Sequence, residues 1–324
     1  MKTTKLYDSK GDARVRRDES RPRRSALFLR GDNLYHHERA VKSATDIVLF
    51  DLEGTVPMQH KEAARAGVRK ALTELDFHGK EKAVRVNPIT SDMWYEDLLA
   101  VVEVKPDLLV LSWTQTGEEM RIFDAVLTAM EKKHGIPVGH IRLMPLIEVI
   151  QGVANVEEIA EATPRVSGLM FGSGDYTHDT DGISGEEENV RLLFARMRIL
   201  TAARVAGIDA IDTPYMINRE YGHRDMEGFE RVCKHVRGLG FDGKACFTPA
   251  QAEIANRVFS PTAEEVEEAV SSERIHEMRG REQTTDEAVL GIAPGYVGVQ
   301  EGYRAAHTAP ASEVLRRARR AGVI

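Results

Sequence analysis

Residues 46–52 read DIVLFDL, residues 61–75 read KEAARAGVRKALTEL, and residues 82–87 read KAVRVN. The first and third stretches are short, apolar and rich in β-branched residues, whereas the second repeats its apolar residues at helical spacing. The short stretches are largely apolar along their length, as expected of strands that are covered on both faces of a parallel sheet. The three stretches therefore predict a strand–helix–strand unit.

The same alternation extends from Ser25 to residue 258. Strands are predicted at Ala26–Arg30, Asp46–Leu52, Lys82–Asn87, Asp107–Ser112, Ile141–Glu148, Val166–Gly172, Gly207–Thr213 and Gly240–Phe247. Helices are predicted at Leu34–Ser43, Lys61–Leu75, Trp94–Glu103, Glu118–Lys133, Gly152–Glu161, Glu186–Ala206, Asp225–Arg237 and Pro249–Val258. Because eight such repeats close a parallel barrel, we expect an α/β fold, a (β/α)8 TIM barrel. An open doubly wound sheet is the alternative, disfavoured because no GxGxxG follows the first strand.

Three regions are expected along the chain. Residues 1–24 form a basic arm, either flexible, strapped to another subunit or anion-binding, and residues 25–260 form the catalytic barrel. Residues 261–324 form an extension that acts as a lid or an inter-subunit strap. In the extension we expect a helix at Ser260–Val270 with Ser260 or Thr262 as N-cap, a loop at 279–312, and a helix at Ser312–Ala321.

Composition narrows the classes of function. The chain has 42% hydrophobic and 29% charged residues and a net charge of −7, which disfavours nucleic acid and anionic membranes as partners. It has two cysteines, Cys233 and Cys246, in no CxxC arrangement, and no apolar run long enough for a membrane span or a signal core. We therefore expect a cytoplasmic protein.

Polar residues gather where the predicted strands end, and the active site of a parallel barrel lies at the carboxyl ends of its strands. Five strands contribute: the strand ends read Asp51-Leu52-Glu53, Arg85-Val86-Asn87, Glu148, Gly172-Ser173-Gly174-Asp175 and Asp212-Thr213-Pro214. We expect these groups to converge on one mouth.

Glu148 and Asp175 are the candidate metal ligands. Glu148 ends an otherwise apolar strand, so its carboxylate must be solvated, paired or metal-bound. Asp175 follows Gly172 and Gly174, which allow close approach of the backbone to a ligand. Two carboxylates with water suit Mg²⁺, although each carboxylate has the alternative of capping a helix or pairing with an arginine.

Arg85 ends the third strand and is the candidate clamp for a substrate carboxylate. The alternative is a salt bridge from Arg85 to Glu53 or Asp51, and the two roles are compatible. No serine nucleophile motif surrounds Ser173.

Taken together, the segments RSALFLRGDN, DIVLFDLEGTV, KEAAR, VRVN, LIEV, GLMFGSGDYTHD, GIDAIDTPY and FSPTAEEVEEA occur in an order that resembles the citrate lyase β-subunit branch of the HpcH/HpaI aldolase superfamily. The branch includes malyl-CoA and citramalyl-CoA lyases. The resemblance covers roughly residues 24–270.

The resemblance implies a homo-trimeric or hexameric barrel that cleaves or forms a carbon–carbon bond beside a carbonyl. It implies that Glu148 and Asp175 hold Mg²⁺ and that Arg85 orients the substrate carboxylate and stabilises an enolate. Glu53 or Asp51 is expected to order Arg85 or the waters of the metal. Arg30, Gly172, Ser173, Gly174 and Pro214 are the further candidates for substrate binding.

The sequence departs from the family pattern around the mouth. LEDAV becomes LEGTV, which places Gly54 where an acid is usual, and a Pro-Lys pair becomes Ser112-Trp113. Gly174 replaces a glutamate, Thr248 replaces a histidine, and Arg30 adds a cation after the first strand. The metal and carboxylate anchors are retained while their surroundings change, so the substrate need not be citryl-CoA or malyl-CoA.

We therefore expect a Mg²⁺-dependent carbon–carbon lyase or aldolase acting on a 3-hydroxy acyl carboxylate, with a CoA thioester as one option. Arg24, Arg30 and the basic arm are candidates for attracting a CoA ester. Two alternatives stay open at this point: a condensing enzyme or thioesterase of the malate synthase type, and a non-catalytic barrel that serves as an assembly subunit or a ligand-binding module.

Overall fold

The computed structural model describes residues 20–182, 190–215, 225–282 and 311–324. Among them, Arg23–Phe259 belongs to one compact unit, and the residues from Ser260 onward belong with residues 20–22 to another. The three functional regions expected from the sequence stay a prediction.

Parallel strands close the first unit into a barrel in the order of the chain, β1-β2-β3-β4-β5-β6-β7-β8. The strands are β1 (Ser25–Arg30), β2 (Ile47–Asp51), β3 (Glu81–Val86), β4 (Leu108–Leu111), β5 (Arg142–Ile147), β6 (Gly168–Phe171), β7 (Asp209–Asp212) and β8 (Gly243–Cys246). β1 pairs with β8 as well as with β2, so the sheet has no free edge. The predicted (β/α)8 barrel is confirmed.

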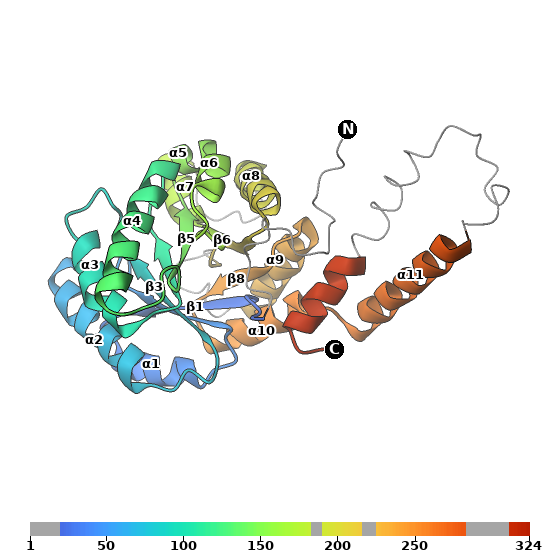
Figure 1. Ribbon diagram of the computed structural model, residues 1–324, viewed down its shortest axis with the longest axis horizontal. Helices are drawn as coiled ribbons and strands as arrows, with labels where there is room; N and C mark the ends of the chain where they lie inside the picture. The colour runs from blue at the N-terminus through green and yellow to red at the C-terminus, as the bar shows by residue number, and fades with distance from the viewer. Residues whose placement is uncertain (1–19, 183–189, 216–224, 283–310) are drawn as a thin grey trace. The chain divides into compact units, whose positions relative to one another are not determined.

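Helices surround the strands of the barrel (Figure 1). They are α1 (Leu34–Val41), α2 (Lys61–Glu74), α3 (Trp94–Val101), α4 (Gly117–Lys133), α5 (Ile150–Ala154), α6 (Val156–Glu161), α7 (Ser173–Asp179), α8 (Val190–Ala206), α9 (Met226–Leu239) and α10 (Pro249–Phe259), with short 3-10 turns η2 (Met58–His60) and η3 (Val102–Val104). Most match the expected helices to within a few residues. The expected helix Gly152–Glu161 is instead two helices, because α5 ends before Asn155 and α6 begins after it.

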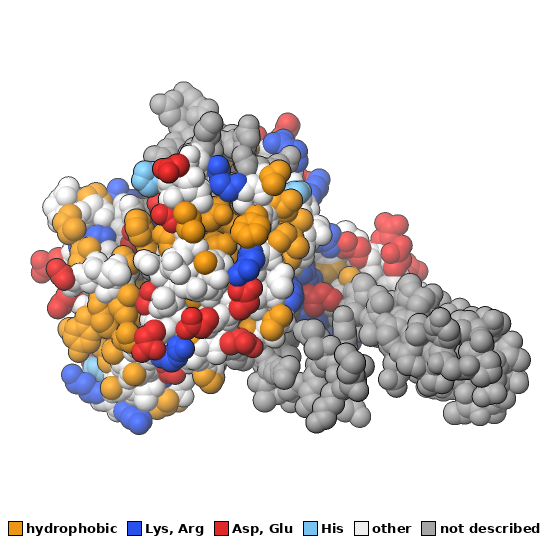
Figure 2. All heavy atoms as spheres, turned by 90° about the horizontal axis from the view of Figure 1, so that it is seen from above, with side chains coloured by type: hydrophobic (Ala, Val, Ile, Leu, Met, Phe, Trp, Pro, Cys, Tyr) orange, Lys and Arg blue, Asp and Glu red, His pale blue; other side chains and the backbone are white. Residues whose placement is uncertain are grey.

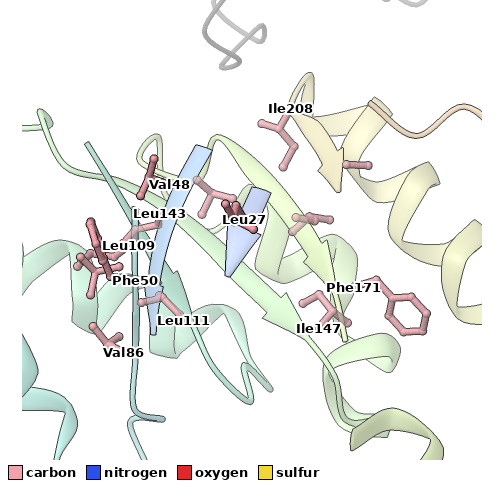
Figure 3. Packing of buried hydrophobic residues seen from close by; sticks show 14 of the residues in the cluster. Leu27, Val48, Phe50, Val86, Leu109, Leu111, Leu143, Ile147, Phe171 and Ile208 are labelled. Carbon is pink, nitrogen blue, oxygen red and sulfur yellow. The ribbon is translucent and has the colours of Figure 1, made fainter. Parts of the chain in front are cut away.

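Two apolar layers fill the barrel unit, and the two-residue period of the strands separates them. Alternate residues such as Phe28, Leu49 and Met144 form a cluster inside the barrel. Their neighbours, including Phe50 and Phe171, form the larger cluster that joins the strands to the helices (Figure 3). Both faces of each strand are therefore buried, which explains why the strands read as nearly continuous apolar runs.

Arg23 closes the amino-terminal end of the barrel. Its guanidinium is buried and donates to Glu81 at 2.6 and 2.8 Å, to the Ser167 backbone oxygen at 2.9 Å and to Asp209 at 3.3 Å. The expected flexible arm, 1–24, is therefore wrong for Arg23 and for Arg24, which pairs with Asp46 at 2.8 Å. Residues 1–19 of the arm lie outside the described residues.

The second unit contains α11 (Ala263–Glu282) and a helix at 311–320. Thr262 caps α11: its Oγ1 accepts from the Glu265 backbone N–H at 3.1 Å, and Glu265 accepts in return from the Thr262 N–H at 2.8 Å. The helix is thus longer than the expected Ser260–Val270, and the loop expected from residue 279 begins no earlier than residue 283. Val266 and Ala269 pack against Leu315 and Ala318.

In the part of the chain that the structure describes, no helix is long and apolar enough to cross a membrane. Figure 2 shows acidic and basic side chains interspersed on the visible described face, in keeping with a moderate net charge. The expected cytoplasmic location stays a prediction.

Candidate active site

The inward-facing positions change from apolar to polar at the carboxyl ends of several strands. Ile47 and Leu49 face the barrel interior, and the next residue of that parity on β2 is Asp51. The same step leads from Ala83 to Arg85 on β3 and from Met144 and Leu146 to Glu148 after β5. The full layer, in strand order, is Arg30, Asp51, Arg85, Ser112, Glu148, Gly172, Thr213 and Phe247.

Arg85 is buried and paired with two carboxylates. Its Nε and Nη2 each donate to Asp51 at 2.7 Å, and its Nη1 lies 2.9 Å from Glu53. Its Cζ lies 5.2 Å from the centre of the Phe28 ring. Burial lowers the pKa of Arg85, but the charges of Asp51, Glu53 and Glu148 raise it above its ordinary value overall. The salt bridges expected as an alternative are confirmed. Asp51 accepts from the Nε–Nη2 edge of the guanidinium and leaves its Nη1–Nη2 edge.

Asp51 holds both the side chain of Arg85 and the backbone of the turn after β2. Its two oxygens accept from the backbone N–H groups of Glu53 at 2.9 Å and Thr55 at 3.0 Å. Burial raises the pKa of Asp51, but the charge of Arg85 and hydrogen bonds from Arg85, the Thr55 hydroxyl and the Glu53 N–H lower it below its ordinary value. Gly54 lies in the same turn, and a Cβ there would stand 3.2 Å from Arg85 Nη2.

Glu148 is buried beside other carboxylates. Its Oε1 accepts from the Trp113 backbone N–H at 2.8 Å. Burial raises the pKa of Glu148 well above its ordinary value, the charges of Asp175 and Glu53 raise it further, and Arg85 and the Trp113 hydrogen bond oppose the shift. A group so placed is a strong candidate for binding a cation or a proton.

Trp113 adopts a strained backbone conformation that the sequence gives no sign of. Its φ is +53°, in the left-handed region that side chains other than glycine rarely adopt. In this turn after β4, the Trp113 N–H donates to Glu148. Strained positions cluster at functional sites, and this one is hydrogen-bonded to a candidate ligand.

Asp175 lies in a short helix that the sequence analysis missed. α7 begins at Ser173 directly after Gly172, and Asp175 and Gly174 are exposed in its first turn while Ser173 is buried. Gly172 is needed for close packing, because a Cβ there would lie 2.5 Å from Glu148 Cβ and 2.7 Å from Glu148 Oε2. The sequence GSGD offered a weak helix signal, since two of its four residues are glycine.

The remaining candidates for substrate binding differ in their exposure and in the end of the barrel at which they lie. Arg30 is exposed and held by Asp32, with its Nε and Nη2 at 3.0 and 2.7 Å from that carboxylate, which also accepts from His60. Pro214 is half-buried after β7. Arg24, a candidate for attracting a CoA ester, precedes β1 and so lies at the opposite end of the strands from the mouth, where it pairs with Asp46.

Asp212 was expected to converge on the mouth, and this is wrong. It ends β7 one residue after the inward-facing Ile211, so its carboxylate faces outward toward the helices. It accepts there from Arg196 of α8 and from Lys244 of β8. Thr213, the next residue, has the inward parity.

The donor set at the mouth fits a hard divalent cation. Within the described chain no group of three His, Cys, Asp or Glu residues is arranged to hold a metal. Glu148 and Asp175 offer two carboxylates. Burial and then the charge of Asp175 raise the pKa of Glu148, and a cation bound by both groups would offset that charge. Two protein oxygens completed by water suit Mg²⁺.

Comparisons with known proteins identify the family. The model of the HpcH/HpaI aldolase/citrate lyase family matches residues 24–249. Citrate lyase subunit beta of Leuconostoc mesenteroides subsp. cremoris is 35% identical over 78% of this chain and 82% of its own. L-malyl-CoA/beta-methylmalyl-CoA lyase of Cereibacter sphaeroides is 31% identical over 77% and 83%, respectively.

Solved structures agree with the fold. RipC from Yersinia pestis is 30% identical, with a TM-score of 0.62 over 77% of this chain and all of its own. CitE from Mycobacterium tuberculosis, in complex with magnesium, acetoacetate and coenzyme A, is 23% identical, with a TM-score of 0.66 over 93% of this chain and 99% of its own. The protein therefore belongs to the HpcH/HpaI aldolase/citrate lyase family of carbon–carbon lyases.

Proposed function

We propose that the protein is a Mg²⁺-dependent carbon–carbon lyase that cleaves a 3-hydroxy acyl carboxylate to a 2-oxo acid and an acyl fragment. The proposal is supported by the polar layer at the mouth of a barrel of this family, which includes Arg85 and Glu148, and by Asp175, whose charge acts on Glu148. An anionic ligand pair beside one buried cation suits a reaction that develops negative charge next to a carbonyl.

Glu148 and Asp175 would hold the metal. Mg²⁺, when bound there, would act as a Lewis acid toward a substrate carbonyl and offset the negative charge that develops on it. Trp113 supports this role of Glu148, because its N–H fixes one carboxylate oxygen at 2.8 Å. Gly172 supports it by letting α7 begin against the side chain of Glu148.

Arg85 would bind the substrate carboxylate. Asp51 accepts hydrogen bonds from the Nε–Nη2 edge of the guanidinium. A substrate carboxylate would therefore bind at the Nη1–Nη2 edge, where it would compete with Glu53. Asp51 and Glu53 are thus positioning groups that hold the plane of Arg85. Gly54 leaves room at Nη2 that any larger residue would reduce.

The acyl fragment is either a free acid or a CoA thioester. The relatives named as malyl-CoA lyases act on thioesters, and CitE from M. tuberculosis has been solved with coenzyme A. Arg30 is the last residue of β1 and is the candidate for contacting such a group, although Asp32 competes for it. The homo-trimer or hexamer expected from the sequence is part of this proposal.

Calorimetry and thermal shift of metal-stripped protein would test the proposal. Mg²⁺ should bind and raise the melting temperature, further with one of pyruvate, oxaloacetate or glyoxylate present, and acetyl-CoA tests the thioester arm. Glu148→Gln and Asp175→Asn should abolish the Mg²⁺ response, whereas the exposed Glu62→Gln should leave it intact.

Absence of any response to millimolar Mg²⁺ in the wild type would refute the metal site and favour the non-catalytic alternative. If the metal and a 2-oxo acid bind, products decide the reaction: the 3-hydroxy acyl compound should be cleaved without net thioester hydrolysis. Net condensation or hydrolysis would instead support the malate synthase-type alternative.

A further inference from the structure

A buried charged cluster lies outside the barrel wall, behind the mouth. Asp212, Lys244 and Arg196 are each at most 1% exposed. Asp212 accepts from Lys244 Nζ at 2.6 Å and from Arg196 Nε and Nη2 at 2.8 and 3.2 Å. Two cations thus pair with one carboxylate. This arrangement fixes all three side chains, because moving any one of them would leave a buried charge without its partner.

The cluster also makes a hydrogen bond to the backbone of the next residue in the chain, Thr213. Lys244 Nζ also donates to the main-chain oxygen of Thr213 at 2.7 Å. β7 ends at Asp212, so Thr213 is the first residue beyond the strand and has no ladder hydrogen bonds of its own in the sheet pairing. The ammonium of Lys244 replaces that support, and the side chain of Thr213 faces the mouth with a fixed backbone.

The Thr213 hydroxyl in turn holds the start of α7. Its Oγ1 accepts from the Ser173 backbone N–H at 3.0 Å and lies 3.0 Å from Ser173 Oγ. The N-cap residue of α7 is Gly172, which has no side chain to cap the helix. Thr213 therefore supplies, from the next strand, the cap that most helices take from their own N-cap residue.

The placement of α7 matters because this helix carries Asp175. α7 has seven residues, too few to be stable by itself, so its position depends on contacts with the rest of the barrel. On its other side it begins against Glu148, which a Cβ on Gly172 would touch at 2.5 Å. Thr213 and Glu148 together fix where Asp175 stands relative to the second carboxylate.

We propose that Thr213 is a positioning residue for the Glu148–Asp175 pair, held in place by the Lys244–Asp212–Arg196 cluster behind the barrel wall. The inference rests on the proposed Mg²⁺ site. Thr213 touches neither metal nor substrate in this scheme; it acts through Ser173 and the first turn of α7. Supporting groups of this kind typically change metal affinity about 10- to 100-fold when removed.

The test is Mg²⁺ binding by calorimetry to metal-stripped full-length protein. Thr213→Val keeps the shape of the side chain but removes the acceptor, and should weaken Mg²⁺ binding at least about 10-fold. Thr213→Ser keeps the hydroxyl and should bind Mg²⁺ within about twofold of the wild type. Thr45→Val is the matched control, because Thr45 is also buried and hydrogen-bonded but lies before β2, at the opposite end of the strands.

The outcomes separate this inference from the proposed function. Equal Mg²⁺ affinity in the wild type and Thr213→Val would overturn the positioning role while leaving the metal site intact. Equal weakening by Thr213→Val and Thr45→Val would overturn it as well, since loss of stability alone would then explain the result. No binding by the wild type would instead refute the proposed metal site itself.

Discussion

Gly172→Ala is the substitution whose effect the geometry defines most sharply. An added Cβ would lie 2.5 Å from Glu148 Cβ, whereas ordinary contacts begin at 3.4 Å. The two groups must therefore separate by 3.4 − 2.5 = 0.9 Å. Because Glu148 is buried and Gly172 begins α7, the separation moves one proposed ligand or the helix that carries the other.

The displacement is large for a metal site. Ligand distances in working sites vary by roughly 0.2 Å, so a shift of 0.9 Å in either group breaks the geometry of the carboxylate pair. We expect Mg²⁺ affinity to fall at least about 10-fold and turnover about 100-fold, with a loss of stability of about 1–3 kcal/mol from overpacking.

Calorimetric titration of the metal-stripped variant measures the affinity, and urea unfolding measures the stability. Gly238→Ala is the control, since a Cβ at that position on α9 meets nothing within 4 Å and its backbone is helical. Wild-type Mg²⁺ affinity in Gly172→Ala would refute the reasoning, because it would mean that the Glu148 side chain can move without consequence for the site.

Three further predictions follow from charge. Glu148→Gln should raise the melting temperature of the metal-free protein at neutral pH, by about 2–4 °C for each kcal/mol gained, because the amide removes the cost of burying a carboxyl group that is ionised in the unfolded chain. Mg²⁺ affinity should increase with pH up to the raised pKa of Glu148, with proton release visible as a buffer-dependent binding enthalpy. Asp212→Asn should cost about 3–5 kcal/mol in urea unfolding, because it strands two buried cations, whereas Asp92→Asn on the surface should change little.

The sign of the pH dependence follows from linkage. The folded-state pKa of Glu148 lies above the unfolded value, so the folded metal-free protein binds more protons there than the unfolded chain does. Stability of the metal-free protein therefore falls as pH rises from the unfolded pKa toward the folded one. Asp51 has the opposite sign: its folded pKa is lowered, and the stability that it contributes is lost as pH falls through that value.

The fold and much of the mouth could be predicted because the two-residue alternation of each strand continues into the polar residues at its carboxyl end. Asp51, Arg85 and Glu148 follow apolar inward positions by two or four residues, and the sequence displays that spacing directly. Asp212 was misplaced because it is one residue out of phase, and one residue reverses the face of a strand. A carboxylate at the end of a strand therefore indicates a site residue only if it lies an even number of residues from the inward-facing positions of that strand.

Other features depend on contacts that a linear sequence does not display. Arg23 was assigned to an arm because it lies among other basic residues, yet its partners are 58 to 186 residues away in the chain. α7 was missed because a seven-residue helix with an internal glycine is stabilised by Thr213 rather than by its own propensity. The turn at Trp113 likewise has a long-range partner, Glu148, 35 residues away in the chain.

The distribution of charge across the barrel wall links stability to the proposed chemistry. Glu148 has Arg85 as its cationic neighbour and Asp175 and Glu53 as anionic ones, and Arg85 is committed mainly to Asp51. Burial and the neighbouring carboxylates raise the pKa of Glu148 well above its ordinary value, so burying this group costs the metal-free fold free energy at a position where a cation would bind. Evolution could remove that weakness with an amide, as in the Glu148→Gln variant, but the same change removes the ligand. A measured gain in metal-free stability together with a loss of Mg²⁺ binding would therefore identify Glu148 as a residue retained for function at the expense of the fold.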